Sequence, residues 1–301
     1  MSRVYKDIDL LPTGTASENI TEGCLVLEGG AWRGLYTVGV LDAMMEHDIN
    51  LKTVVGISAG GLSAIGYVSG QIGWGVRIDL RYRHDGNYCG LRALFKEKSI
   101  TGFGYLYKNI LRELPLDKKR LNKPDRRLLV GATDMITGRI HYFEKGACNL
   151  SRAVQASATV PYLSRPVVMD GVPYMDGGCS EKIPYTWAKE NKEKKIVVVR
   201  TREREYRRKE KDADILTRRM YKDYPNFIDS ISHTNKKFNL MTDELDEREA
   251  AGEIFVVAPS EVVTVSRFEG DMDKLGDLYW LGYRDMLARV DELKSYLSDG
   301  E

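Results

Sequence analysis

Short, continuous runs of apolar residues, each followed by a turn and then by a helical pattern, recur along this chain. The runs at 24–27, 53–55, 128–132 and 196–199 consist mostly of Val, Leu and Ile. Strands that are buried on both faces have such runs, and their alternation with helices is typical of a parallel sheet covered on both sides. We therefore expect an α/β fold, a three-layer α/β/α sandwich with a mostly parallel central sheet.

Two turn signals predict hairpins in addition to this alternation of strands and helices. Beyond residue 205 the sequence changes to charged, mainly helical segments with one further strand-like run. The predicted C-terminal region is thus a mainly helical extension of the sandwich. We expect hairpins at 128–143 and 167–176, helices at about 35–47, 59–69 and 151–158, a strand at 254–259 and one long final helix at about 274–297.

Composition excludes several classes of protein. The chain has 301 residues, of which 43% are hydrophobic, and a net charge of +1, so nothing in its overall charge predicts a nucleic-acid partner. No apolar run approaches the length of a membrane span, and the first 23 residues do not resemble a signal peptide. The cysteines are scattered without metal-ligand spacing, so we expect reduced thiols, no metal, no cofactor and a cytoplasmic protein. They are Cys24, Cys89, Cys148 and Cys179.

A candidate nucleophile stands in the sequence Gly56-Ile57-Ser58-Ala59-Gly60, after a β-branched run and before a small-residue helix. This G-x-S-x-G pattern is typical of a nucleophile elbow, a tight strand-to-helix turn that exposes a serine hydroxyl. The turn strains the central residue, and the glycines on either side avoid collisions across it. An ordinary glycine-rich turn is the alternative interpretation of this motif when it is taken alone.

A candidate oxyanion site follows the first apolar run, in the hexamer GGAWRG at residues 29–34. Glycines let consecutive backbone N–H groups point into one concavity, which suits a negatively charged oxygen. The competing interpretation is a nucleotide-binding loop, but the G-K-[ST] ending of a P-loop is missing. The candidate residues are Gly29, Gly30 and Ala31 for the oxyanion hole, with Arg33 and Gly34 in support; we expect Arg33 to brace the loop.

A candidate base, Asp176, follows the second predicted hairpin and precedes Gly177 and Gly178. Strand ends are where open α/β sheets place their chemistry, so a carboxylate there, with little bulk around it, suits proton transfer. A simple D-G-G turn is the more common interpretation of this motif in isolation. Its occurrence together with the other two motifs favours the catalytic one.

These three motifs, in this order, resemble the patatin-like phospholipase family over roughly residues 23–200. The segment Ala156-Ser157-Ala158-Thr159-Val160-Pro161 is also similar to the family's A-S-x-x-x-P segment. The resemblance implies hydrolysis of lipid acyl esters by a serine–aspartate dyad, with Ser58 as nucleophile and Asp176 as base. Together with the polar start of the chain and the change to charged helices beyond residue 205, it divides the chain into a lead-in at 1–22, a catalytic domain at 23–205 and a charged C-terminal region at 206–301. The supporting motif residues would be Arg33, Gly34, Gly56, Gly60, Gly177 and Gly178.

Two positions depart from the family pattern. Ala31 replaces a glycine that is common in the first motif, and Lys182 stands near where an asparagine usually precedes the proline after D-G-G. Histidine is the rival base, because Ser58…Asp176…His233 formally satisfies the order of an α/β-hydrolase triad. His233 lies in a polar, helix-like region outside the core pattern, which favours the dyad.

The lipid partner is expected to meet two parts of the chain. Residues 200–222 carry ten Lys and Arg against five Asp and Glu, a local charge of +5, which would suit peripheral contact with anionic headgroups. A solvated helix with internal ion pairs is the alternative. Aromatic residues between Tyr67 and Tyr107 would line an acyl-chain cleft or pack in the core. Acyl transfer by the same dyad, and a catalytically silent lipid-binding or scaffold protein, remain alternative functions.

Overall fold

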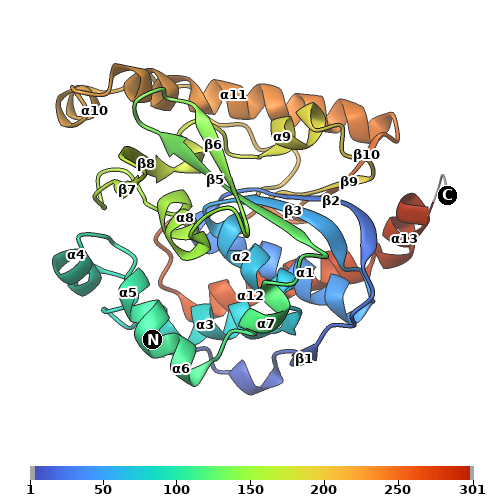
Figure 1. Ribbon diagram of the computed structural model, residues 1–301. Coiled ribbons are helices and arrows are strands. Elements are labelled where there is room, and N and C mark those ends of the chain that lie inside the picture. The colour runs from blue at the N-terminus through green and yellow to red at the C-terminus, as the bar shows by residue number, and fades with distance from the viewer. Residues whose placement is uncertain (1–3, 299–301) are drawn as a thin grey trace.

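The computed structural model describes residues 4–298 and is built around one mixed sheet (Figure 1). Its strands are β2 (Thr21–Leu27), β3 (Leu51–Ile57), β5 (Arg127–Asp134), β6 (Ile140–Glu144), β7 (Val167–Met169), β8 (Val172–Asp176), β9 (Ile196–Val199) and β10 (Ile254–Val257). They lie in the order β10-β9-β2-β3-β5-β8-β7, with β6 also paired to β5. Strands β10, β9, β2, β3 and β5 are mutually parallel, whereas β6, β7 and β8 join the sheet by antiparallel pairing. The expected mostly parallel sheet is confirmed.

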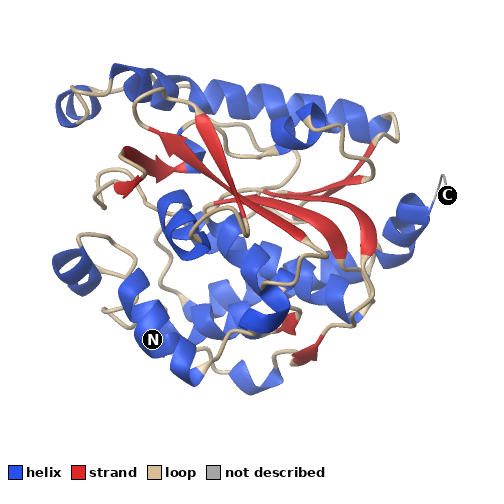
Figure 2. Ribbon diagram, viewed as in Figure 1, coloured by secondary structure: helices blue, strands red, loops and turns tan. Residues whose placement is uncertain are grey.

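Alternation along the central strands divides the core into two layers. On β2, Leu25 and Leu27 face one hydrophobic cluster, whereas Cys24 and Val26 face the other. Successive side chains of a strand point to opposite faces, so an unbroken apolar run buries both. Helices cover the two faces as a three-layer sandwich (Figure 2). One face carries α1 (Gly34–Glu46), α2 (Ala59–Val68), α3 (Trp74–Tyr82) and α12 (Met272–Leu287); the other carries α9 (Tyr185–Glu190) and α11 (Pro225–Ala250).

The remaining elements are short. A two-stranded sheet pairs β1 (Gly14–Thr15) with β4 (Gln71–Ile72). The expected single final helix is wrong: the backbone forms a turn at residues 288–289, which divides it into α12 and α13. The other helices are α4 (Leu91–Glu97), α5 (Phe103–Tyr105), α6 (Leu111–Glu113), α7 (Lys118–Leu121), α8 (Leu150–Ser157), α10 (Ile215–Met220) and α13 (Val290–Ser298), with a π-helical turn at Leu106–Ile110 and 3₁₀ turns at Ile8–Leu10, Ala31–Arg33 and Gly177–Cys179.

The C-terminal region contributes to the same core as the motifs. It supplies β10, which pairs with β9 at the edge of the sheet, and α12, which packs on α1. The two helices cross closely because both have glycine at the crossing. A Cβ at Gly39 would collide with the carbonyl oxygen of Tyr279, and one at Gly282 with that of Tyr36. None of the helices between residues 4 and 298 combines the length and hydropathy that a bilayer-spanning helix requires.

Candidate active site

The candidate nucleophile occupies a strained turn between β3 and α2. Ser58 has φ 54° and ψ −119°, a conformation that costs an L-residue free energy and that persists only where packing enforces it. The glycines make the turn possible: a Cβ at Gly56 would lie 2.6 Å from the carbonyl carbon of Gly60. The side chain of Ser58 is 9% exposed. This is the geometry that the G-x-S-x-G pattern predicts.

The register of the sheet brings Asp176 to this turn. Ile57 pairs with Gly131 on β5, and the next residue of β5, Ala132, pairs with Asp176 on β8. Because β8 is antiparallel, it enters from the carboxyl edge and ends beside the nucleophile turn. A Cβ at Gly177 would collide with the carbonyl oxygen of Gly131, so glycine after the aspartate permits this close approach.

Ser58 and Asp176 share a short hydrogen bond. The Ser58 Oγ donates to Oδ2 of Asp176 over 2.7 Å, and the N–H of Gly178 donates to Oδ1 over 2.8 Å. Burial raises the pKa of the Asp176 carboxyl, whereas these two hydrogen bonds and the nearby Lys182 act to lower it. A carboxylate with a raised pKa is a better proton acceptor than a free aspartate at neutral pH.

A second serine holds the nucleophile turn in place. Ser157, at the end of α8, accepts a hydrogen bond from the N–H of Ser58 over 2.7 Å and donates one to the carbonyl oxygen of Gly131 over 2.6 Å. It is fully buried and ties the turn to the central sheet. The sequence analysis assigned it no role, although it lies in the A-S-x-x-x-P segment, the one signal that pointed to it.

The glycine loop offers two free amides rather than three. The N–H of Gly29 donates to the carbonyl oxygen of Lys182 over 3.0 Å, so it is not available to an oxyanion, and this part of the prediction is corrected. The amides of Gly30 and Ala31 have no acceptor among residues 4–298. Ala31 has φ +50°, so the strain that a glycine would avoid is accepted here. Gly34 approaches α2 closely, since a Cβ there would lie 2.7 Å from Cβ of Ala59.

Arg33, which we expected to brace the loop, makes no side-chain hydrogen bond to it within residues 4–298. Its side chain is 5% exposed, and its guanidinium donates to no acceptor within the described chain. Burial lowers its pKa to about 10, with Arg202 and Arg208 adding repulsion and Glu28 opposing it.

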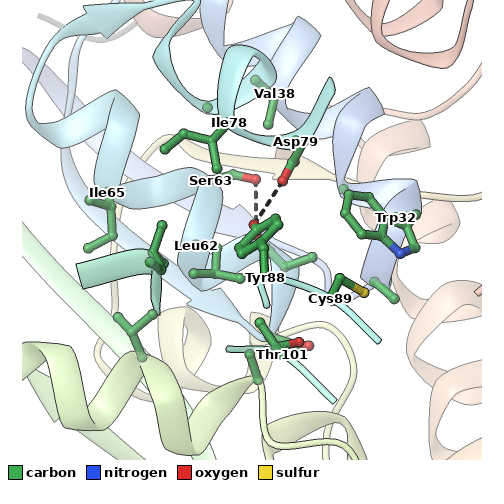
Figure 3. A pocket seen from close by; sticks show the side chains of 18 of the residues that line it. Trp32, Val38, Leu62, Ser63, Ile65, Ile78, Asp79, Tyr88, Cys89 and Thr101 are labelled. Carbon is green, nitrogen blue, oxygen red and sulfur yellow. Dashed lines mark hydrogen bonds between the residues drawn. The ribbon is translucent and has the colours of Figure 1, made fainter. Parts of the chain in front are cut away.

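An apolar pocket opens from Ser58. It has a volume of about 190 Å³ and is lined mainly by hydrophobic side chains from α2, α3, α8 and the segment between α4 and α7. Figure 3 shows Leu62, Ile65 and Ile78 turned toward this space. Asp79 is the acidic residue of this lining: it accepts a hydrogen bond from the Tyr88 hydroxyl over 3.2 Å, and burial raises its pKa to about 7. The volume and the mainly apolar lining of the pocket suit an extended apolar group.

The aromatic residues expected at a cleft divide between several environments. Trp74 and Tyr88 line the pocket, Tyr82 and Phe103 are buried in the core, and Phe95 is exposed. The pocket also contains Trp32 and Tyr107, which contribute further apolar surface.

The rival base lies elsewhere. His233 is on α11, where its side chain is 54% exposed and its ring nitrogen lies 2.9 Å from the carbonyl oxygen of Asp229. Within residues 4–298, no hydrogen bond of Ser58 or Asp176 involves a histidine. No group of three His, Cys, Asp or Glu side chains in this part of the chain is arranged to hold a metal ion. The arrangement as a whole is a hydroxyl paired with a carboxylate at the mouth of an apolar pocket.

Comparison with known proteins adds a family match. The family model described as patatin-like phospholipase matches residues 25–188, and a model described as a domain of unknown function (DUF6363) matches residues 224–298. The uncharacterized protein YjjU of Escherichia coli (strain K12) is 28% identical over 182 residues, which are 59% of this chain and 51% of that protein. This chain therefore spans about half the length of that relative.

Two further matches extend over most of the chain. The uncharacterized protein R571 of Acanthamoeba polyphaga mimivirus is 23% identical over 285 residues, which are 89% of this chain and 94% of that protein. Among solved structures, VipD from Legionella pneumophila has a TM-score of 0.49 and 16% sequence identity, with 94% of this chain and 68% of that chain covered.

Proposed function

Since the chain belongs to the patatin-like phospholipase family, we propose that it hydrolyses carboxylic esters of lipids, with Ser58 as the nucleophile and Asp176 as the base. The observation that carries the proposal is the 2.7 Å hydrogen bond between these side chains at the mouth of an apolar pocket. A hydroxyl and its proton acceptor are then in place before the substrate binds, and the pocket receives the acyl chain.

In the first half of the reaction the ester carbonyl carbon lies against the Ser58 Oγ. As Oγ attacks, its proton passes to Asp176, and the carbonyl oxygen becomes an oxyanion that accepts hydrogen bonds from the amides of Gly30 and Ala31. Collapse of this tetrahedral intermediate breaks the bond to the alcohol oxygen. The proton held on Asp176 goes to that oxygen, the alcohol leaves, and the acyl group remains on Ser58.

In the second half water takes the place of the alcohol. It attacks the acyl carbon while its proton passes to Asp176, and the oxyanion again lies on the two amides. The bond from the acyl carbon to Oγ breaks, Oγ recovers the proton, and the fatty acid leaves with its chain in the apolar pocket. If an acceptor alcohol attacked instead of water, the same steps would give an acyltransferase.

The test is fatty-acid release from a panel of micellar phospholipids, lysophospholipids and monoacylglycerols, with Ser58→Ala as the matched control. We expect release by the native chain and none above background by the variant. Adding glycerol and analysing the products separates hydrolysis from acyl transfer. Equal background rates for both proteins on every lipid would overturn the proposed function and favour a silent lipid-binding or scaffold protein.

We further propose peripheral contact with lipid surfaces through residues 200–222. Five of the ten basic residues in this segment are engaged inside the protein: Arg200, Arg204 and Arg207 form ion pairs with acidic residues of α11, and Arg202 and Arg208 stack over aromatic rings. The surface around α10 carries three of the other five basic residues. It combines the cations Arg218, Arg219 and Lys222 with the exposed side chains Ile215, Leu216 and Met220.

An apolar patch beside cations is the combination that binds anionic membrane interfaces. Sedimentation with liposomes containing an anionic phospholipid tests this proposal, with liposomes of zwitterionic lipid alone as the control. We expect stronger binding to the anionic liposomes and a loss of binding in Ile215→Ser/Leu216→Ser. Equal binding to both liposomes, or no effect of the double substitution, would overturn it.

A further inference from the structure

Beside the oxyanion loop lies a group of three arginines, of which Arg33 is buried and Arg202 and Arg208 are partly buried, and one buried carboxylate, Glu28, lies with them. We propose that Arg33, Arg202 and Arg208 form a binding site for a phosphate-type anion adjacent to Ser58. This inference rests on the proposed function where it names the source of the anion: the phosphate of an acyl ester whose alcohol carries one, or else free phosphate.

The sheet places these arginines together. Leu27 of β2 pairs with Val199 of β9, so the turns that follow the two strands lie side by side. Arg33 comes from the first turn, and Thr201 and Arg202 from the second. The contact between the turns is close, because a Cβ at Gly30 would lie 2.8 Å from the Thr201 Oγ1.

Arg208 completes the group from the segment that follows β9. Its guanidinium stacks over the ring of Phe238 at 4.5 Å and has an Nη2 atom 4.0 Å from Oε1 of Glu28. Burial and the neighbouring Arg267 and Arg202 lower its pKa, with Glu28 opposing them. Stacking fixes the plane of the guanidinium and leaves its N–H groups available to a ligand.

Each of the three arginines has unsatisfied donors. The Nε atoms of Arg33, Arg202 and Arg208 are buried without an acceptor in the described chain, and so is the hydroxyl of Thr201. Buried guanidinium N–H groups without acceptors are costly, and an anion shared by several of them would offset that cost. An oxyanion with three or four acceptor oxygens would satisfy them at once.

Glu28 is the buried acid beside these arginines, and its one negative charge does not balance their three positive charges. Its side chain is fully buried, and its Oε2 already accepts a hydrogen bond from the N–H of Thr201 over 2.6 Å. The other oxygen, Oε1, has no hydrogen-bond partner. A single carboxylate therefore faces three guanidinium groups and leaves a net positive charge at this point.

The position of the group relative to Ser58 indicates which part of a substrate it would bind. The same loop carries both the amides of Gly30 and Ala31 and the side chain of Arg33. Arg267, an exposed residue that lines the apolar pocket, adds positive charge near Arg33, Arg208 and Asp176. With the acyl chain in the pocket and the carbonyl on the amides, the alcohol part of the ester points out of the pocket, where a phosphate would meet the arginines.

Binding is tested apart from catalysis in the Ser58→Ala background. Inorganic phosphate is titrated by calorimetry into this protein and into the same protein carrying Arg202→Gln and Arg208→Gln. We expect saturable binding that weakens about tenfold or more in the double variant, because each charge-assisted hydrogen bond contributes about 1.5–3 kcal/mol. Arg284→Gln, at an exposed arginine of α12, is the matched control. Arg202→Lys/Arg208→Lys keeps the charge, and thermal melting checks that every variant is folded.

The source of the anion is tested kinetically with two esters of one fatty acid, a lysophospholipid and a monoacylglycerol. If the lipid supplies the phosphate, the glutamine substitutions lower kcat/KM for the lysophospholipid about tenfold or more relative to the monoacylglycerol. Phosphate binding that the substitutions weaken, without this change in preference, assigns the site to free phosphate. If the substitutions change neither phosphate binding nor the preference between the two esters, the proposed site is overturned. Phosphate binding in a protein that hydrolyses no ester supports the site and overturns the proposed function instead.

Discussion

The Ser58 Oγ lies 2.7 Å from Oδ2 of Asp176, although 118 positions separate the two residues in the sequence. The sheet creates this contact: Ser58 follows β3, Asp176 ends β8, and β5 lies between the two strands and pairs with both. A serine hydroxyl so close to a carboxylate with a raised pKa is prepared to lose its proton.

Asp176→Asn removes the proton acceptor and keeps the size of the side chain. We expect kcat for a lipid ester to fall by about 10²–10⁴-fold, the range that a positioned general base contributes. His233→Ala is the matched control, and it should retain the native rate because His233 lies on α11 with Asp229 as its neighbour. A large loss in His233→Ala with little in Asp176→Asn would contradict the dyad.

The pH dependence of hydrolysis reports the ionisation of the same carboxyl. Burial raises the pKa of Asp176, and the base functions only when it is ionised. Activity should therefore be present above this pKa and be lost as the pH falls through it, with a midpoint above the ordinary aspartate value of about 3.9. The measurement is kcat/KM for a soluble short-chain ester from pH 4 to pH 9. A rate that stays constant down to the ordinary value would show that this carboxyl is not the base.

Ser157→Ala tests the support of the nucleophile turn. The substitution leaves the N–H of Ser58 and the carbonyl oxygen of Gly131 without their shared partner. We expect kcat to fall about tenfold or more with a smaller change in KM, because a displaced nucleophile affects the reaction more than the binding of the acyl chain. The stability should fall by about 1–3 kcal/mol, measured by urea unfolding. Ser63→Ala, on the next turn of α2, provides a comparison; equal kinetic effects of the two substitutions would remove the positioning role from Ser157.

Ser58→Gly and Ser58→Ala together measure the strain at the nucleophile. Both remove the hydroxyl, so they lose the same hydrogen bond to Asp176, but only glycine adopts φ 54° and ψ −119° without strain. We expect the glycine variant to be more stable to unfolding by about 1 kcal/mol. An alanine variant of equal or greater stability would show that the turn is relaxed in solution.

Much of this arrangement is predictable from the sequence. Apolar runs buried on both faces predicted the central strands, and the motifs around Ser58 and Asp176 predicted the turns that carry them, because glycines at fixed offsets have local steric causes. The closeness of the two side chains was an expectation drawn from the family resemblance. Their catalytic roles and the division of the chain into domains stay predictions.

The remaining features depend on tertiary contacts that no local pattern encodes. The hydrogen bond from Gly29 to the Lys182 carbonyl joins loops on two different elements, so the sequence could not show that this amide is occupied. The support from Ser157 and the unpartnered state of Arg33 arise in the same way. The break between α12 and α13 was missed because its apolar residues continue the helical period across residues 288–289.

The central claim, that Ser58 is an activated nucleophile, is tested most directly by covalent labelling with a fluorophosphonate followed by peptide mass mapping. We predict one adduct, on Ser58, formed in the native chain and in His233→Ala, slowed strongly in Asp176→Asn and absent in Ser58→Ala. Labelling at another residue, or no labelling of the folded native chain, would contradict it.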